Sequence, residues 1–482
     1  MPDYDLLGFS EGLRMRARLE GWPAFFALAT QYPTNGEMIA LESEERDWHA
    51  NDPELIRSAE RDQTALVESF RPDDDELEQA LEVPLVRKIR IAPDRSANAA
   101  VCWLDDDSQR IDLNVGLGLA IEDAVLSACC ARGFATAREA ASDLPPAFPM
   151  LLVGAEGSFR YHDYTIPWHR RRRRQRSLFV RQLPVDPARM AIADLLTALS
   201  FRWVMLHEQA HWLAGHLDYL RVSRRVRSLA LSETRLAATG VLGPFESLDH
   251  CMELQADSLA TQLLLTFGLA DDWLERSPHA KAYTDRMDRC DPDRRSASPD
   301  FRERLPRLRM MLLAAGIGCL LFEVRRQHLA PRPRPRSHPS PSARLINVFA
   351  TALSTYGDIA YFEADEYVHD DTYSVQRLRP ALIEMTNVLV DLQIFAGVVG
   401  LRDENFLAAI RQPQPGASPS LAAMSPLASD VFRLLSASSG GTAYNTPGAL
   451  EFEALGPAGR ELWTALAPYS RMGAWRPDEE TP

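Results

Sequence analysis

The sequence predicts an α+β fold that is mainly α-helical. Two observations lead to this prediction: apolar residues recur at helical spacing over most of the 482 residues, and only three short runs between residues 85 and 115 have the composition of β-strands. No repeat of fixed period is present. Apolar residues make up 46% of the chain and charged residues 25%, so the chain can bury a substantial core.

Charge and cysteine usage exclude several classes of protein. The formal net charge of -14 argues against a general nucleic-acid-binding surface, because phosphate binding needs basic residues over much of a fold. The cysteines show no Cys-x-x-Cys spacing, so neither a zinc ribbon nor a disulfide framework is predicted. The N-terminus lacks a basic segment followed by an apolar one. No secretory signal is therefore evident, and we expect a cytoplasmic protein.

The first part of the chain predicts helices and then a small sheet. Residues 1–80 look helical and acidic, and they end in the run Asp73–Glu76, which is typical of a solvated helix start. Three strand-like runs follow, at residues 85–91, 99–104 and 110–115. Because turn-forming residues separate them, they predict a small antiparallel meander.

Two connectors divide the rest of the chain. Pro331–Ser342 is rich in proline, arginine and serine, and Gln412–Ser420 is rich in proline and serine. We therefore expect a core over residues 81–330, an extension of it over residues 331–411 and a helical region over residues 412–482.

One apolar run invites comparison with a membrane span. Met310–Phe322 is uncharged over thirteen residues. A span needs about 20 apolar residues, whereas runs of roughly 10 to 14 are more often buried helices. We therefore expect a buried helix here and no membrane span.

The stretch MLHEQAHWLAGHLDYL carries the motif His207-Glu208-x-x-His211. Asp186 is a favourable N-cap and Pro187 a favourable first helical residue, so a helix is expected to begin here and to carry the motif. Residues four apart lie about 40° from each other around a helix, so both imidazoles can reach one metal ion beside Glu208. The alternative is a helix whose histidines only pack in the core.

A third ligand decides between these alternatives. His216 lies about 140° beyond His211 on a continuous helix, so it is expected to point away unless the helix breaks at Gly215. The segment Asp249–Leu265 has helical periodicity and carries Glu253 and Asp257 four residues apart. Glu253 can supply a carboxylate ligand, and Asp257 can accept the Nδ1 hydrogen of a ligand histidine.

These residues resemble the gluzincin metallopeptidases, which carry H-E-x-x-H on one helix and E-x-x-x-D on a later one. The sequences ELQADSLA (Glu253–Ala260) and SHPSPSARL (Ser337–Leu345) are similar to blocks of the HtpX-like and CAAX-prenyl-protease-like peptidases. The phrase HExxHxxxGH is similar to the soluble ImmA and IrrE type peptidases and to the phage-exclusion peptidase Lit. The resemblance extends from His207 to Arg344.

The resemblance implies a zincin-like metallopeptidase core and a role for each matching residue. It implies Zn²⁺ bound by His207, His211 and Glu253, with Glu208 as the general base and Asp257 supporting a ligand histidine. It implies that His338 lies near the substrate carbonyl oxygen and that Arg344 supports the acidic side chains of the site. For His338 the alternative is a stray histidine in a proline-rich linker.

The expected function is therefore a zinc-dependent endopeptidase that cleaves an intracellular protein or peptide, under a regulatory partner or ligand, in stress response or phage defence. The substrate strand is expected to lie antiparallel to a sheet edge formed by residues 110–115. The basic run Arg170–Arg174 is expected to be a solvated loop, with acidic-substrate or nucleic-acid binding as alternatives. Two other functions stay open: a zinc-containing sensor with little or no peptidase activity, and a metal-independent helical scaffold.

Overall fold

The structure is a computed structural model of the chain. It describes residues 53–94, 98–104, 108–129, 131, 134–135, 187–224, 230–232, 246–270, 280–281, 304–329, 338–362, 371–401, 403–411, 425–435 and 444–472. The predictions for residues 1–52, the run Arg170–Arg174 and the connector Gln412–Ser420 lie outside these residues. The predicted domain boundaries stay predictions.

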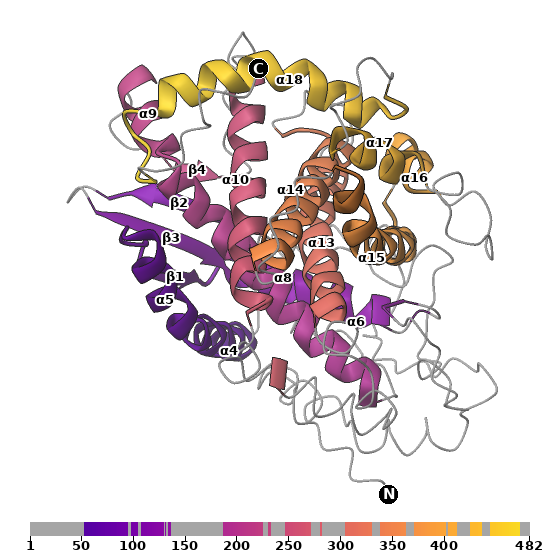
Figure 1. Cartoon of the computed structure of the whole chain (residues 1–482). Helices are drawn as coiled ribbons and strands as arrows, with labels where there is room; N and C mark the ends of the chain where they lie inside the picture. The colour runs from indigo at the N-terminus through magenta and orange to yellow at the C-terminus, as the bar shows by residue number, and fades with distance from the viewer. Residues whose placement is uncertain are drawn as a thin grey trace, which may run out of the picture.

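The described chain is mainly helical with one small sheet, so the α+β prediction is confirmed at this level. Long helices cross one another in the centre, and the sheet lies at one side of them (Figure 1). The helices are α4 (Pro53–Ser69), α5 (Arg71–Leu81), α6 (Val115–Cys129), α8 (Pro187–Leu213), α9 (His216–Arg224), α10 (Glu246–Gly268), α13 (Leu305–Leu329), α14 (Pro341–Phe362), α15 (Asp371–Val398), α16 (Glu404–Ile410), α17 (Pro426–Leu435) and α18 (Pro447–Leu466).

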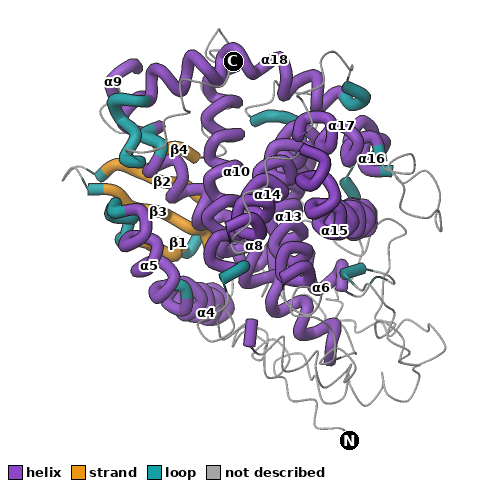
Figure 2. The backbone as a smooth tube through the Cα atoms, in the orientation of Figure 1, coloured by secondary structure: helices purple, strands orange, loops and turns teal. Residues whose placement is uncertain are grey.

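The sheet is mixed rather than an antiparallel meander. Its strands are β1 (Ile89–Ala92), β2 (Ala99–Trp103), β3 (Gln109–Asn114) and β4 (Ala230–Ser232), in the order β1-β3-β2-β4 (Figure 2). β2 is antiparallel to β3 and β4, whereas β1 is parallel to β3. The expectation that residues 110–115 form an edge is also wrong, because β3 is paired on both sides. Residue composition indicates which runs are strands but not which strands pair.

The core is built around helix α8. This helix packs against α6, α10, α13 and strand β2. Trp203 of α8 is fully buried, and its indole Nε1 donates a hydrogen bond of 3.1 Å to Thr261 Oγ1 of α10. Ala256 and Ala260 of α10 are also fully buried, and such small side chains let two helices approach closely. The two helices that carry the predicted motifs are therefore neighbours in the core.

Among the residues that the structure describes, two helical segments are long and apolar enough to cross a membrane: Leu305–Val324 and Leu378–Val398. The most apolar part of the first segment is 89% buried within the protein, as expected for the run Met310–Phe322. The corresponding part of the second segment is 50% buried within the protein.

The acidic run before the sheet is not wholly solvated, contrary to the prediction. The carboxylate of Asp74 is buried and accepts a hydrogen bond of 2.6 Å from Arg202 Nη2 of α8. The guanidinium of Arg202 also lies 5.0 Å from the centre of the Phe70 ring. A partner distant in sequence therefore holds one carboxylate of this run inside the core.

Gly215 ends the straight course of α8 and allows α9 to start at His216. Its φ is +78°, a conformation that favours glycine, and an added Cβ would lie 2.5 Å from the backbone carbonyl of Tyr469. The last described residues reinforce this junction, because Arg471 N donates a hydrogen bond of 3.0 Å to Leu213 O. The C-terminal segment therefore packs directly on the turn between α8 and α9.

We expect Gly215→Ala to destabilise the protein more than Gly400→Ala. Both glycines have positive φ, but an added Cβ at Gly400 would meet no atom within 4 Å. Gly400→Ala should therefore cost only the left-handed conformation, about 1–2 kcal/mol in the free energy of unfolding. Gly215→Ala should cost this amount plus the displacement of Tyr469. Urea unfolding of both variants measures the difference, and equal losses would show that the contact with Tyr469 is unimportant.

Candidate metal centre

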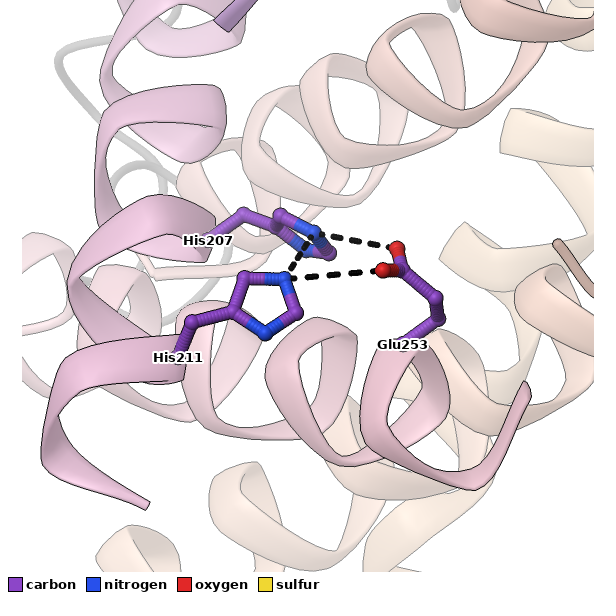
Figure 3. A group of neighbouring side chains, drawn as sticks. All are labelled: His207, His211 and Glu253. Atoms are coloured by element: carbon purple, nitrogen blue, oxygen red, sulfur yellow. Dashed lines mark hydrogen bonds and ion pairs between the residues drawn. The ribbon is translucent and has the colours of Figure 1, made fainter. Parts of the chain in front are cut away.

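Two helices bring three metal-binding side chains together. His207 and His211 project from α8, and Glu253 projects toward them from α10 (Figure 3). His207 Nε2 lies 3.1 Å from His211 Nε2 and 3.4 Å from Glu253 Oε2, and His211 Nε2 lies 3.7 Å from Glu253 Oε1. All three residues are buried. They form a group that could hold a metal ion.

These donor atoms are close enough together to bind a single ion. Atoms that bind zinc at about 2.0–2.2 Å in tetrahedral geometry lie roughly 3.3–3.6 Å from one another. The two imidazole nitrogens are 3.1 Å apart, and each lies within 3.7 Å of a different oxygen of Glu253. With one donor atom taken from each residue, all three atoms lie within 4.8 Å of one another. Two imidazole nitrogens and one carboxylate are also a donor set that zinc takes in proteins. The residues therefore fit the ion in chemistry, and they lie close enough together to share it.

The charges around the group keep Glu253 ionised. Burial raises the pKa of Glu253, but His338, His207 and His211 lower it more strongly, so it lies well below its usual range. Burial lowers the pKa of His211 well below its usual value, which leaves that imidazole neutral. An ionised carboxylate and a neutral imidazole are the forms that bind a metal ion.

His207 has a different proton balance. Burial lowers its pKa, but hydrogen bonds and charge interactions with Asp257 and Glu253 outweigh burial and raise the pKa to about 10. A metal ion must displace a proton from this imidazole to be bound by it. Ion binding at this site is therefore coupled to proton release.

Asp257 and Arg344 stand behind His207. Asp257 Oδ1 lies 3.0 Å from His207 Nδ1, the ring nitrogen that faces away from the donor group. Arg344 donates two hydrogen bonds of 2.7 Å to the two oxygens of Asp257, through Nε and Nη2. Burial raises the pKa of Asp257, but Arg344 and His207 lower it below its usual range. The positions fit the supporting roles that the resemblance implies for both residues.

Glu208 lies between the donor group and the sheet. Its side chain is buried, and a hydrogen bond from the backbone N–H of Val101 in β2 reaches its carboxylate. Burial and the charge of Glu253 raise the pKa of Glu208 to about 8, against the lowering effects of His207 and of this hydrogen bond. A carboxyl group whose pKa is near neutrality can both accept and return a proton.

His338 lies beside the group, just before the start of α14. Its Nε2 is 3.5 Å from Glu253 Oε2, and its side chain is 14% exposed, more than either histidine of α8. Burial and Arg344 lower its pKa to about 4, although Glu253 acts in the opposite direction. The histidine of the proline-rich connector is therefore placed beside Glu253 of the donor group.

The structure corrects the expectation for His216 and adds Gln255 to the site. Because α8 breaks at Gly215, His216 turns back, and its Nδ1 lies 2.7 Å from His211 Nδ1. His216 Nε2 lies 2.9 Å from Gln255 Oε1. The glycine before His216 was the signal for this placement. Nothing in the spacing of Gln255 indicated its contact.

No family model, curated protein or solved structure matches this chain.

Proposed function

We propose that this chain is a zinc-dependent metallopeptidase of the gluzincin type. The observation that carries the proposal is the donor geometry: His207, His211 and Glu253 bring one ligand atom each to within 4.8 Å of one another, with Glu208 next in the chain to the first ligand. Three protein ligands leave the fourth position of a tetrahedral ion open, which is typical of catalytic rather than structural zinc sites.

In this proposal the residues of the chain divide the chemistry of hydrolysis among them. Bound zinc supplies a water molecule of lowered pKa and polarises a peptide carbonyl. Glu208 takes a proton from the attacking water and returns it to the leaving amine. His338 donates a hydrogen bond to the oxygen of the tetrahedral intermediate, since it lies beside Glu253 and is the more exposed of the histidines at the site.

The substrate strand, in this proposal, adds to the sheet at β4. β3 is central, which removes residues 110–115 as the docking edge. β4 is the edge strand beside β2, and Val101 of β2 contacts both β4 and Glu208. A peptide that pairs with β4 would therefore be separated by a single strand from β2, which contacts the proposed base Glu208.

One observation favours a second function, a zinc-containing sensor with little peptidase activity. His207, His211 and Glu253 are at most 3% exposed, so a protein substrate must displace some covering segment before it reaches an ion there. Glu208 argues for catalysis, because a structural zinc site needs no general base. Burial in turn suits an intracellular peptidase that is restrained until a partner or ligand opens the site.

Glu208→Gln separates the two functions. We expect this variant to retain zinc, because Glu208 is not a ligand, and to lose peptidase activity by roughly 10²- to 10⁴-fold, the contribution of a general base. Protein N-termini are compared in cells that express the parent or the variant, and zinc is measured in both purified proteins. New N-termini should appear with the parent only. Glu461→Gln, at an exposed position of α18, is the matched control and should behave as the parent.

Two other outcomes would contradict the peptidase proposal. Zinc in both proteins with identical N-termini would contradict the peptidase proposal and favour the sensor. Purified parent protein that binds no zinc would contradict both functions and favour a metal-independent helical scaffold.

A further inference from the structure

We propose that His216 and Gln255 are positioning residues that fix the tautomer of His211, so that His211 Nε2 presents its lone pair to the metal ion. The proposal rests on the zinc site of the proposed function, but it does not depend on peptidase activity. It concerns a second series of hydrogen bonds at the site, which supports His211. This series, here called the chain of hydrogen bonds, is distinct from the contacts of Asp257 and Arg344 behind His207.

Hydrogen-bond contacts link Gln255 of α10 to His216 of α9, and His216 to His211 of α8. Gln255 Oε1 lies 2.9 Å from His216 Nε2, and His216 Nδ1 lies 2.7 Å from His211 Nδ1. His211 Nε2, on the other side of its ring, is the atom that lies 3.1 Å from His207 Nε2. Each histidine therefore uses both ring nitrogens, and His211 uses one of them toward the donor group.

When Gln255 presents its amide oxygen to His216, the hydrogens of these two hydrogen bonds can be placed in only one way. The amide oxygen only accepts, so His216 Nε2 carries the hydrogen. The two Nδ1 atoms of His216 and His211 lie 2.7 Å apart, so one of them carries the hydrogen between them, and in a His216 ring that has its hydrogen at Nε2 the Nδ1 atom is the acceptor. His211 Nδ1 must then donate to it, which leaves His211 Nε2 without a hydrogen. That is the tautomer a metal ion requires at Nε2.

The two ligand histidines are thus held by different chemistry. A carboxylate oxygen of Asp257 faces His207 Nδ1, whereas the imidazole of His216 faces His211 Nδ1. His216 is fully buried, so water does not substitute for its ring nitrogen. The break at Gly215 is what makes this possible, because it turns the first residue of α9 back toward the last turn of α8.

The test measures zinc affinity by chelator competition in purified full-length protein. His216→Leu and Gln255→Leu remove successive members of the chain, and each should lower zinc affinity about 10- to 100-fold, the usual effect of losing a partner of a ligand histidine. His216→Asn offers a side-chain oxygen near the position of Nδ1, and Gln255→Glu keeps an acceptor. Both should bind zinc more tightly than the corresponding leucine variants.

Two further measurements distinguish positioning from general packing. Leu220→Ala removes a buried side chain of α9 outside the chain of hydrogen bonds, and it should leave zinc affinity within about 3-fold of the parent. The ¹⁵N chemical shifts of His211 should report hydrogen at Nδ1 in the zinc-loaded parent. If His216→Leu does not fold, Gln255→Leu alone decides, because Gln255 is only partly buried.

Several results would overturn the proposal while leaving the zinc site intact. These are parent-like zinc affinity in both leucine variants, equal losses in Leu220→Ala and His216→Leu, or a hydrogen on His211 Nε2. Parent protein that binds no zinc would instead refute the site itself. Parent-like cleavage by Glu208→Gln would refute the assignment of the base and leave the inference about His216 unchanged.

Discussion

Replacing Glu253 with glutamine is expected to lower zinc affinity more than 100-fold. Losing a residue that only supports a ligand typically lowers metal affinity by about 10- to 100-fold, and the loss of a ligand itself should exceed that. The amide keeps the size of the carboxylate but removes its negative charge, and amide groups are poor ligands for zinc. Glu253 is the only anion among the three donors, and it lies within 3.7 Å of both ligand nitrogens. Any zinc-dependent hydrolysis should be lost together with the ion.

The measurement is chelator competition, with bound zinc determined independently after gel filtration. Glu461→Gln is again the matched control, since it makes the same chemical change at an exposed site. It should bind zinc as the parent does. Retention of parent affinity by Glu253→Gln would mean that the ion, if bound, takes another third ligand, and the gluzincin assignment would then be wrong.

The proximity of His207, His211 and Glu253 could be predicted from sequence in part because helical geometry is local. A spacing of four residues places His207 and His211 on one face, whatever the rest of the fold does. Glu253 required one further step, the assumption that two apolar helices pack together. The fully buried Ala256 and Ala260 of α10 are consistent with that step.

The parts that could not be predicted depend on contacts between segments far apart in the chain. The parallel pairing of β1 with β3 follows from which strand edges meet, and residue composition carries no such information. Asp74 looked solvated because its partner, Arg202, is 128 residues away. The direction of His216 depended on whether the helix continues past Gly215. A glycine permits that break but does not require it.

Replacing Arg344 with methionine is expected to destabilise the protein by about 3–5 kcal/mol in the free energy of unfolding, the usual cost of removing one partner of a buried ion pair. Asp257 and Arg344 are almost completely buried, and two hydrogen bonds of 2.7 Å join them. Methionine fills part of the space of the arginine stem but supplies no donor. The buried Asp257 carboxylate would lose both hydrogen bonds from Arg344 and would keep its contact with His207.

The chain offers a matched control in the sheet. Arg90 also donates two hydrogen bonds to one carboxylate, that of Asp112, at 2.9 and 2.7 Å, but its side chain is 52% exposed. Because water screens such a pair, Arg90→Met should cost no more than about 1 kcal/mol. Arg110 also donates two hydrogen bonds to Asp112, so this carboxylate stays paired in Arg90→Met. Urea unfolding of both variants therefore compares the loss of a buried pair with the loss of an exposed one.

A double-mutant cycle then isolates the pair from the packing around it. Asp257→Asn removes the charge that Arg344 neutralises, so Arg344→Met should cost less in that background than in the parent, with a coupling of about 0.5–3 kcal/mol. Arg344→Met should also weaken zinc binding, since Asp257 holds His207 in position. If the variant were no less stable than Arg90→Met and bound zinc as the parent does, Arg344 would neither stabilise the core nor support the site, and the support of His207 would rest on Asp257 alone.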